Sequence, residues 1–149
     1  DRIAAGAPHV LRLDVAAALA TVTTPLWFED IRRGQIMCTP QQFGDVVLAR
    51  KDTPARYHLC VTHDDAMQGV TLVTRGDDLR PATHVHRLLQ ALMGWAPPRY
   101  AHHSLIRDKF GLRLAKRHEG ATLREFRARG ASAADVRAQL GFATVQRSS

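Results

Sequence analysis

The stretch GVTLVTRGDDLRPATHVHRLLQALMGWAPPRYAHHSLI, residues 69–106, determines the predicted fold of this chain. It starts with Gly69–Thr74, a continuous apolar and β-branched run that is typical of a strand buried on both faces of a parallel sheet. Pro81–Met93 then has helical spacing of apolar residues, and Gly94 is a suitable helix stop. Arg99–Ile106 is a second strand candidate. Strand, helix and strand within these 38 residues predict a βαβ unit with a right-handed crossover, and therefore an α/β fold.

The residues before this unit are predicted to form a β-rich lobe over residues 1–56. Val10–Val15 alternates roughly, with Leu11, Leu13 and Val15 on one side, and is a strand candidate. Leu26–Phe28 and Val46–Leu48 are further candidates, and glycine and proline residues between them favour turns.

The residues after the unit are predicted to form a small helical tail. Thr122–Ala128 and Ser132–Leu140 carry apolar pairs at helical spacing. Ser132 followed three residues later by Asp135 has the pattern of a capping box, with Asp in the place of Glu.

Composition limits the class of protein. The chain has 149 residues, of which 45% are hydrophobic, so one sizeable core is expected. No apolar run approaches the 18 residues of a membrane span, and the amino terminus lacks the pattern of a signal peptide. Two cysteines, Cys38 and Cys60, are too few for a disulfide scaffold or a cysteine-based zinc site, and each is predicted to be a small core residue. We expect a cytoplasmic protein.

Positive charge is concentrated near the carboxyl terminus. Residues 1–106 hold 11 Lys and Arg against 10 Asp and Glu, giving +1, whereas residues 107–149 hold 10 against 4, giving +6. This distribution favours an anionic partner such as RNA or nucleotide phosphate. The alternative is a solvated helical surface without a ligand.

The eight histidines raise the question of a metal site. His84 and His86 are two residues apart on a predicted helix and face different ways. His102 and His103 are adjacent on a predicted strand and face opposite sides. The segment His63–Asp65 offers ligands in principle, but its aspartates are better explained as caps of the following turn. We therefore expect no metal held by the chain itself.

Two basic groups are predicted to share one crevice. In open α/β sheets, ligands collect beyond the carboxyl ends of the parallel strands. Arg75 follows the first predicted strand, and the loop that carries Lys116 follows the second. The planar fork of Arg75 suits a carboxylate, and the ammonium of Lys116 suits phosphate.

Several segments together resemble the second half of the catalytic domain of class I aminoacyl-tRNA synthetases of the glutamate type. This family comprises the glutamyl-tRNA synthetases and the shorter glutamyl-Q tRNA(Asp) synthetases. The resemblance spans about residues 8–141, is densest at 44–120, and is carried by the segments Gly44–Asp52, Tyr57–Val61, Asp64–Asp78, Ala101–Ile106 and Arg113–His118. It implies a β-rich lobe at 1–56, the second half of a Rossmann-like catalytic domain at 57–115, and a loop with a helical tail at 116–149.

The resemblance implies an ATP site in the second basic segment. Arg113–Arg117 is similar to the KMSKS loop of the family, commonly KLSKR in this branch, with Arg113 in place of the first Lys and Ala115 in place of Ser. Lys116 is the implied catalytic residue, with Arg113, Arg117 and His102 as further ATP-binding residues. His102 lies in a segment similar to the family's His-x-Pro-Leu, although Ser104 replaces the Pro. Activation is attack by an ionised carboxylate on the α-phosphate, so the protein needs to position the reactants and neutralise charge rather than supply a base.

The resemblance also implies the amino-acid site. Tyr57 and Arg75 fall where the family binds glutamate, and Val61 replaces an Asn that is frequent in glutamyl-tRNA synthetases, as in the glutamyl-Q enzymes. The implied substrates are glutamate, ATP with Mg²⁺, and tRNA.

The implied reaction is transfer of glutamate to queuosine of tRNA(Asp), and the alternatives are charging of tRNA(Glu) and a non-catalytic RNA- or nucleotide-binding module. No segment before Tyr57 resembles the family's HIGH motif, so we expect a monomeric carboxy-terminal fragment that lacks the amino-terminal half of the enzyme and is inactive alone.

Overall fold

The structure, a computed structural model, describes residues 5–52, 55–107, 111 and 122–142. The chain divides into two compact units, Asp1–His103 and Ser104–Ser149, and each is described by itself. This division differs from the three parts predicted with boundaries at residues 56 and 115, because strands from both sides of residue 56 belong to one sheet.

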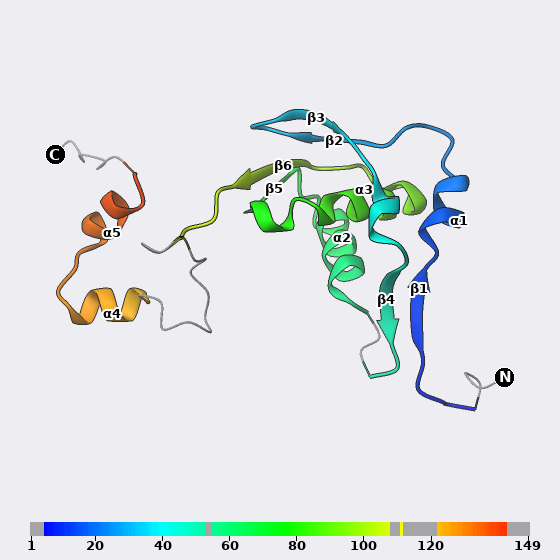
Figure 1. The fold of residues 1–149 in the computed structure, drawn as a ribbon, viewed down its shortest axis with the longest axis horizontal. Helices are drawn as coiled ribbons and strands as arrows, with labels where there is room; N and C mark the ends of the chain where they lie inside the picture. The colour runs from blue at the N-terminus through cyan, green and yellow to red at the C-terminus, as the bar shows by residue number, and fades with distance from the viewer. Residues whose placement is uncertain (1–4, 53–54, 108–110, 112–121, 143–149) are drawn as a thin grey trace. The chain divides into compact units, whose positions relative to one another are not determined.

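The predicted βαβ unit is present in the first compact unit (Figure 1). Strand β5 (Leu72–Gly76) and strand β6 (Arg99–His103) pair in parallel, and helix α3 (Ala82–Met93) connects them after the short 3₁₀ helix η2 (Asp77–Leu79). Gly94 ends α3 in the left-handed conformation, with a φ of 69°, as the sequence pattern predicts. Arg75 lies within β5 rather than after it.

Strand β5 is covered on one face only, so the prediction of burial on both faces was wrong. It lies at the edge of the four-stranded sheet, whose order is β3-β2-β6-β5. Leu72 and Thr74 are exposed, with Leu72 at 40%, while Arg75 on the other face is buried. Exposed and buried residues alternate because successive side chains of a strand point to opposite faces and only one face of β5 is covered.

The other two strands of the sheet come from the predicted β-rich lobe. Strands β2 (Trp27–Asp30) and β3 (Gly34–Met37) form an antiparallel hairpin, and β2 runs parallel to β6 where Asp30 pairs with Tyr100. The last residue of β2 therefore lies beside β6, the final strand of the βαβ unit, although about 70 residues separate Asp30 from Tyr100 in sequence. Helix α3 lies along one face of this sheet (Figure 1).

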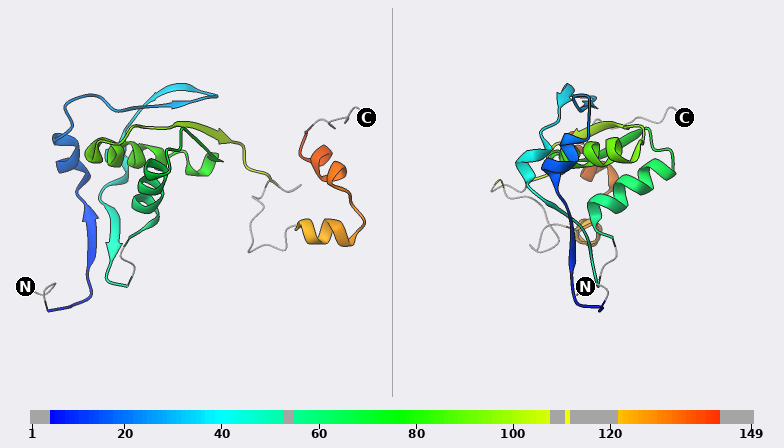
Figure 2. Two further views of the ribbon diagram at one scale, coloured as in Figure 1. Left: turned by 180° about the vertical axis from the view of Figure 1, so that it is seen from behind. Right: turned by 90° about the vertical axis from the view of Figure 1, so that its right-hand side faces the viewer.

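The predicted strand Val10–Val15 is shorter in the structure. Strand β1 (Val10–Leu13) pairs antiparallel with β4 (Val46–Arg50), and the two run side by side away from the four-stranded sheet (Figure 2). Helix α1 (Val15–Ala20) begins at Val15 because the side chain of Asp14 accepts a hydrogen bond of 2.9 Å from the amide of Ala17.

The hydrophobic core lies where α1, β4 and α3 meet. Its buried members share aliphatic side chains and come from both predicted parts of this unit: Val15, Ala18, Leu26, Val46, Val85, Leu88 and Leu89. Cys38, which follows β3 and precedes the 3₁₀ helix η1 (Pro40–Phe43), packs against this core. Burial raises the pKa of the Cys38 thiol to about 11, so the thiol is neutral and behaves as a small core residue. Cys60 is half-buried.

Helix α2 (Tyr57–Met67) packs against α3 (Figure 1). The prediction that Asp64 or Asp65 caps a following turn was wrong, because both lie in the last turns of this helix. The amide of Gln68 donates to the backbone carbonyl of Asp64, not to its side chain.

The second compact unit contains two short helices, α4 (Leu123–Ala128) and α5 (Ala133–Gln139). The predicted capping box of Ser132 and Asp135 is confirmed, and Thr122 with Glu125 forms a second one at the start of α4. Among the described residues, no helix combines the length and the apolar character needed to cross a bilayer.

Candidate functional site

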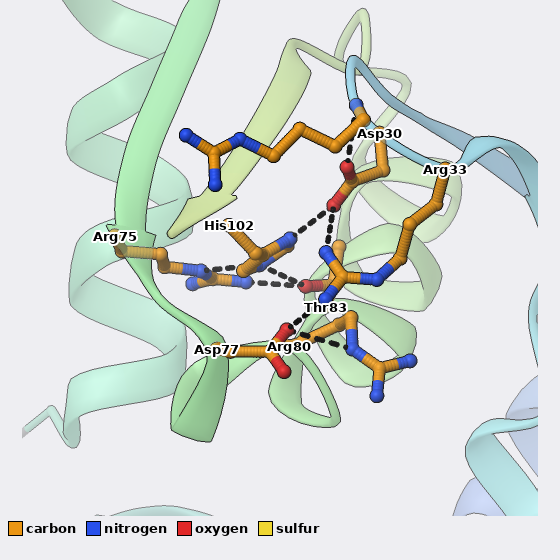
Figure 3. Close-up of polar contacts among 8 residues, drawn as sticks. Asp30, Arg33, Arg75, Asp77, Arg80, Thr83 and His102 are labelled. Carbon is orange, nitrogen blue, oxygen red and sulfur yellow. Dashed lines mark hydrogen bonds and ion pairs between the residues drawn. The ribbon is translucent and has the colours of Figure 1, made fainter. Parts of the chain in front are cut away.

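Arg75 is the centre of a buried polar cluster formed by β5, β6 and α3 (Figure 3). Its side chain is held by three neighbours: Nε donates to His102 Nε2 at 3.2 Å, Nη1 bonds His86 Nδ1 at 3.1 Å, and Nη2 donates to Thr83 Oγ1 at 2.5 Å. The guanidinium also lies 5.2 Å from the centre of the Tyr100 ring, a cation–π contact. A permanently charged group is thus fixed from several sides while only 9% exposed.

Three described side chains use three of the five N–H groups of Arg75. At most one N–H on each terminal nitrogen is therefore available for a further acceptor. Two donors on the two terminal nitrogens are what a bidentate pair with a carboxylate requires. The described contacts therefore leave Arg75 with donors of the kind that a carboxylate pairs with.

The histidines around Arg75 have defined hydrogen-bonding roles. A guanidinium only donates, so the ring nitrogens that face it, His102 Nε2 and His86 Nδ1, are acceptors. His102 then carries its hydrogen on Nδ1, and His86 carries its hydrogen on Nε2, which lies 3.0 Å from His58 Nδ1. All three rings are neutral in this arrangement.

The pKa shifts of these histidines agree with their neutral state. Burial, followed by the charge of Arg75 and the His58 ring, lowers the pKa of His86 to about 3. Burial and the charge of Arg75 also lower the pKa of His58. For His102, burial lowers the pKa more than the hydrogen bond to Asp30 raises it. The histidines therefore add no positive charge beside Arg75.

Asp30, the last residue of β2, is a second buried charged group of the cluster. Asp30 is fully buried and accepts from His102 Nδ1 at 2.6 Å and from the backbone amide of Arg32 at 2.9 Å. Burial opposes ionisation of Asp30, but these hydrogen bonds and the nearby positive charges together hold its pKa below the usual value. Asp30 is therefore a carboxylate that meets Arg75 through His102.

A chain of ion pairs continues from Asp30 to the surface (Figure 3). Arg33 lies 3.7 Å from Asp30 and 3.0 Å from Asp77, and Arg80 lies 3.0 Å from Asp77. Arg33, Asp77 and Arg80 are each about one-third exposed, so these outer pairs contribute less than the buried contacts.

The structure brings together three of the predicted site residues. Tyr57 begins α2, is 50% exposed, and has its ring centre 6.0 Å from that of His86, which bonds Arg75. His102 is 1% exposed and orients Arg75, while His103 on the next position is exposed, as the strand alternation predicts. His84 and His86 face different ways, since His84 contacts the ring of Phe28.

The remaining predicted residues, Arg113, Lys116 and Arg117, lie outside the described residues. The predicted crevice shared by Arg75 and Lys116 therefore stays a prediction. Among the residues that the structure describes, no group of three or more His, Cys, Asp and Glu side chains is arranged to hold a metal ion.

Sequence reasoning missed Asp30, Thr83 and His86. Thr83, His86 and Gln90 are buried polar residues at positions i, i+3 and i+7 of α3, a spacing that places them on one helix face. This stripe was a usable signal, because polar side chains on a buried face need partners. Asp30 had no comparable signal, because its burial depends on the pairing of β2 with the distant β6.

The fold is that of a class I aminoacyl-tRNA synthetase catalytic domain. Residues 1–140 match the family described as tRNA synthetases class I (E and Q), catalytic domain, and the chain belongs to this family. The predicted family and the predicted α/β fold class are thereby confirmed.

Three members of the family illustrate the similarity. The chain is 48% identical over 139 residues to glutamyl-Q tRNA(Asp) synthetase of Rhodobacter capsulatus, covering 89% of this chain and 48% of that protein. It is 35% identical to glutamate–tRNA ligase 2 of Syntrophus aciditrophicus, covering 71% of this chain and 22% of that protein. The crystal structure of a glutamate tRNA ligase from Elizabethkingia meningosepticum in complex with its amino acid superposes with a TM-score of 0.60 at 31% identity, covering 77% of this chain and 22% of that one. The chain thus spans about half or less of the length of these relatives.

Proposed function

We propose that this sequence forms the glutamate-binding part of an ATP-dependent synthetase that activates glutamate as its adenylate and transfers it to tRNA. The observation that carries the proposal is the buried Arg75, held by neutral acceptors with at most one N–H free on each terminal nitrogen. An ordinary surface arginine would not need three side-chain acceptors to hold its guanidinium. A module that only binds RNA would not need a buried receptor for a carboxylate.

The proposed reaction divides between two groups of residues. Arg75 binds a carboxylate of glutamate, and the exposed Tyr57 contacts the rest of the amino acid beside it. A glutamate carboxylate oxygen attacks the α-phosphate of ATP, a new oxygen–phosphorus bond forms, and the bond to pyrophosphate breaks. The attacking carboxylate is already ionised, so no protein base takes part.

In this proposal a second group of residues, in the basic segment Arg113–Arg117, neutralises charge on the leaving pyrophosphate. Lys116 would act on the transition state, with Arg113 and Arg117 beside it and with the backbone near His102 bordering the nucleotide. Mg²⁺ accompanies ATP as part of the substrate and neutralises phosphate charge.

For the acceptor we propose queuosine of tRNA(Asp). Identity to the glutamyl-Q relative is 48%, against 31–35% for the glutamate–tRNA ligases of comparable coverage. Val61, about one helical turn after Tyr57 on α2, also favours this acceptor, since an apolar residue there resembles the glutamyl-Q enzymes. Charging of tRNA(Glu) is the competing outcome.

The test has two arms in the full-length protein. Glutamate-dependent ATP–pyrophosphate exchange without tRNA is expected, with glutamine and aspartate inactive. Radiolabelled glutamate is then expected to attach to tRNA(Asp) that contains queuosine and not to the same tRNA lacking it. Attachment to tRNA(Glu) instead would establish the competing acceptor. Binding of RNA without exchange would show that the protein is a non-catalytic module.

A further inference from the structure

Asp30 has a contact pattern that only a carboxylate provides. Both of its oxygens accept: Oδ1 from the amide of Arg32 at 2.9 Å, and Oδ2 from Nδ1 of His102 at 2.6 Å. The residue is fully buried, and it lies on β2, a strand outside the βαβ unit that carries Arg75. Its position is fixed by the parallel pairing of Asp30 with Tyr100 on β6.

Asp30 determines which nitrogen of His102 carries hydrogen. With Nδ1–H donated to the carboxylate, Nε2 has a free lone pair and accepts from Arg75 Nε at 3.2 Å. The opposite tautomer would set an N–H of His102 against the N–H of Arg75. Asp30 thus acts on the guanidinium although it does not touch it.

The contact from His102 sets the direction of the guanidinium. Nε of Arg75 is held by His102, and Nη2 is held by Thr83, whose hydroxyl also lies 3.3 Å from His102 Nε2. These two contacts fix one edge of a planar group, so they fix where its remaining N–H groups point. The stacked ring of Tyr100, 5.8 Å from His102 with an interplanar angle of 6°, holds the imidazole itself in place.

We propose that Asp30 is a positioning residue for substrate recognition: it holds His102 in the Nδ1–H tautomer, and His102 in turn orients Arg75 toward the substrate carboxylate. This inference rests on the proposed function, because it needs glutamate to bind at Arg75. It adds a residue from the β2–β3 hairpin to the specificity of the site.

The variant Asp30→Asn tests the role with an almost unchanged shape. An asparagine offers one acceptor oxygen and one donor group, so it cannot accept from both Arg32 and His102. The Arg32 amide hydrogen is fixed by the backbone, whereas the imidazole can move its hydrogen to Nε2. We therefore expect the new amide to donate to His102, which then opposes Arg75. The matched control is Asp45→Asn, which removes the same charge from an exposed loop before β4.

Steady-state exchange kinetics of the full-length protein give the first readout. Asp30→Asn is expected to raise the KM for glutamate about tenfold and to leave the KM for ATP unchanged, while Asp45→Asn changes neither. KM does not depend on the concentration of active enzyme, so partial misfolding does not imitate this result. Adding Asp30→Asn to Arg75→Ala should raise the KM for glutamate no further, because Asp30 acts through Arg75.

The second readout is the tautomer of His102, from ¹⁵N NMR shifts of the imidazole. Hydrogen on Nδ1 is expected in the native protein and in Asp45→Asn, and hydrogen on Nε2 in Asp30→Asn. If Arg75→Ala raises the KM for glutamate but Asp30→Asn changes neither the KM nor the tautomer, the positioning role is wrong and the proposed function stands. If Arg75→Ala also leaves the KM unchanged, the proposed function is wrong.

Discussion

Replacing His86 by Gln should remove a large part of the pH dependence of stability. His86 is 3% exposed, bonds Arg75 and His58, and has a pKa lowered by burial from 6.5 to about 3. A glutamine does not titrate, and its amide oxygen is able to accept from Arg75. The variant therefore keeps a neutral partner for the guanidinium while deleting the titrating group.

The magnitude follows from the two pKa values. An unfolded histidine takes up a proton as the pH falls through 6.5, whereas folded His86 does so only near 3. The unfolded state binds more protons in this interval, so the free energy of unfolding falls as the pH falls from about 6.5 to about 3. Between pH 7 and pH 5 this one group removes about 2 kcal/mol. The lowered pKa values of His58 and His102 act in the same direction.

The assay is urea unfolding at pH 7 and pH 5, followed by tryptophan fluorescence. Both tryptophans, Trp27 and Trp95, lie in the compact unit that contains His86. The loss of stability between the two pH values should be about 2 kcal/mol smaller in His86→Gln than in the native protein. His63→Gln is the matched control for removing a histidine from the surface, because the His63 side chain is 53% exposed. Equal pH dependence in His86→Gln and the native protein would refute a neutral, buried His86.

Two further predictions concern Lys116, in the segment similar to the KMSKS loop, and Gly94, in the βαβ unit. Lys116→Ala in the full-length protein should slow single-turnover adenylate formation by at least a hundredfold, from about 3–4 kcal/mol of lost transition-state stabilisation, with little change in glutamate affinity. Compensation by Arg113 or Arg117 would make the loss smaller, and a native single-turnover rate would place Lys116 on an ordinary basic surface. Gly94→Ala should lower the free energy of unfolding by about 1 kcal/mol in urea titrations, because the φ of 69° disfavours any Cβ while no atom lies close enough to clash. An unchanged urea midpoint would contradict the left-handed stop of α3.

The local part of the fold could be predicted from the sequence, and the long-range part could not. Strand β5, helix α3 and its Gly94 stop follow from periodicity and from a single turn residue, signals that lie within the segment itself. The placement of β2 beside β6 depends on a pairing between Asp30 and Tyr100, which no local pattern encodes. The predicted domain boundary at residue 56 was drawn without knowledge of this pairing and stays a prediction.

In the candidate site, too, the local features could be predicted and the long-range contacts could not. Arg75 was predicted as a strand-end cation open to a ligand, because its place near the end of a strand is a local property. Its burial and its three side-chain anchors depend on α3, which supplies Thr83 and His86, and on the neighbouring strand β6, which supplies His102. The tautomer of His102 depends further on Asp30 from the hairpin. Each residue further from Arg75 in this set of contacts depends on one more pairing between distant segments, which no local sequence pattern encodes.

The central claim is that Arg75 binds a glutamate carboxylate during activation. It is tested most directly by glutamate-dependent ATP–pyrophosphate exchange of the full-length protein and its Arg75→Ala variant. Loss of a charge-assisted pair to a carboxylate costs about 1.5–3 kcal/mol, so we predict a rise of roughly tenfold to hundredfold in the KM for glutamate with an unchanged KM for ATP. An Arg75→Ala variant with the native KM for glutamate would contradict the account.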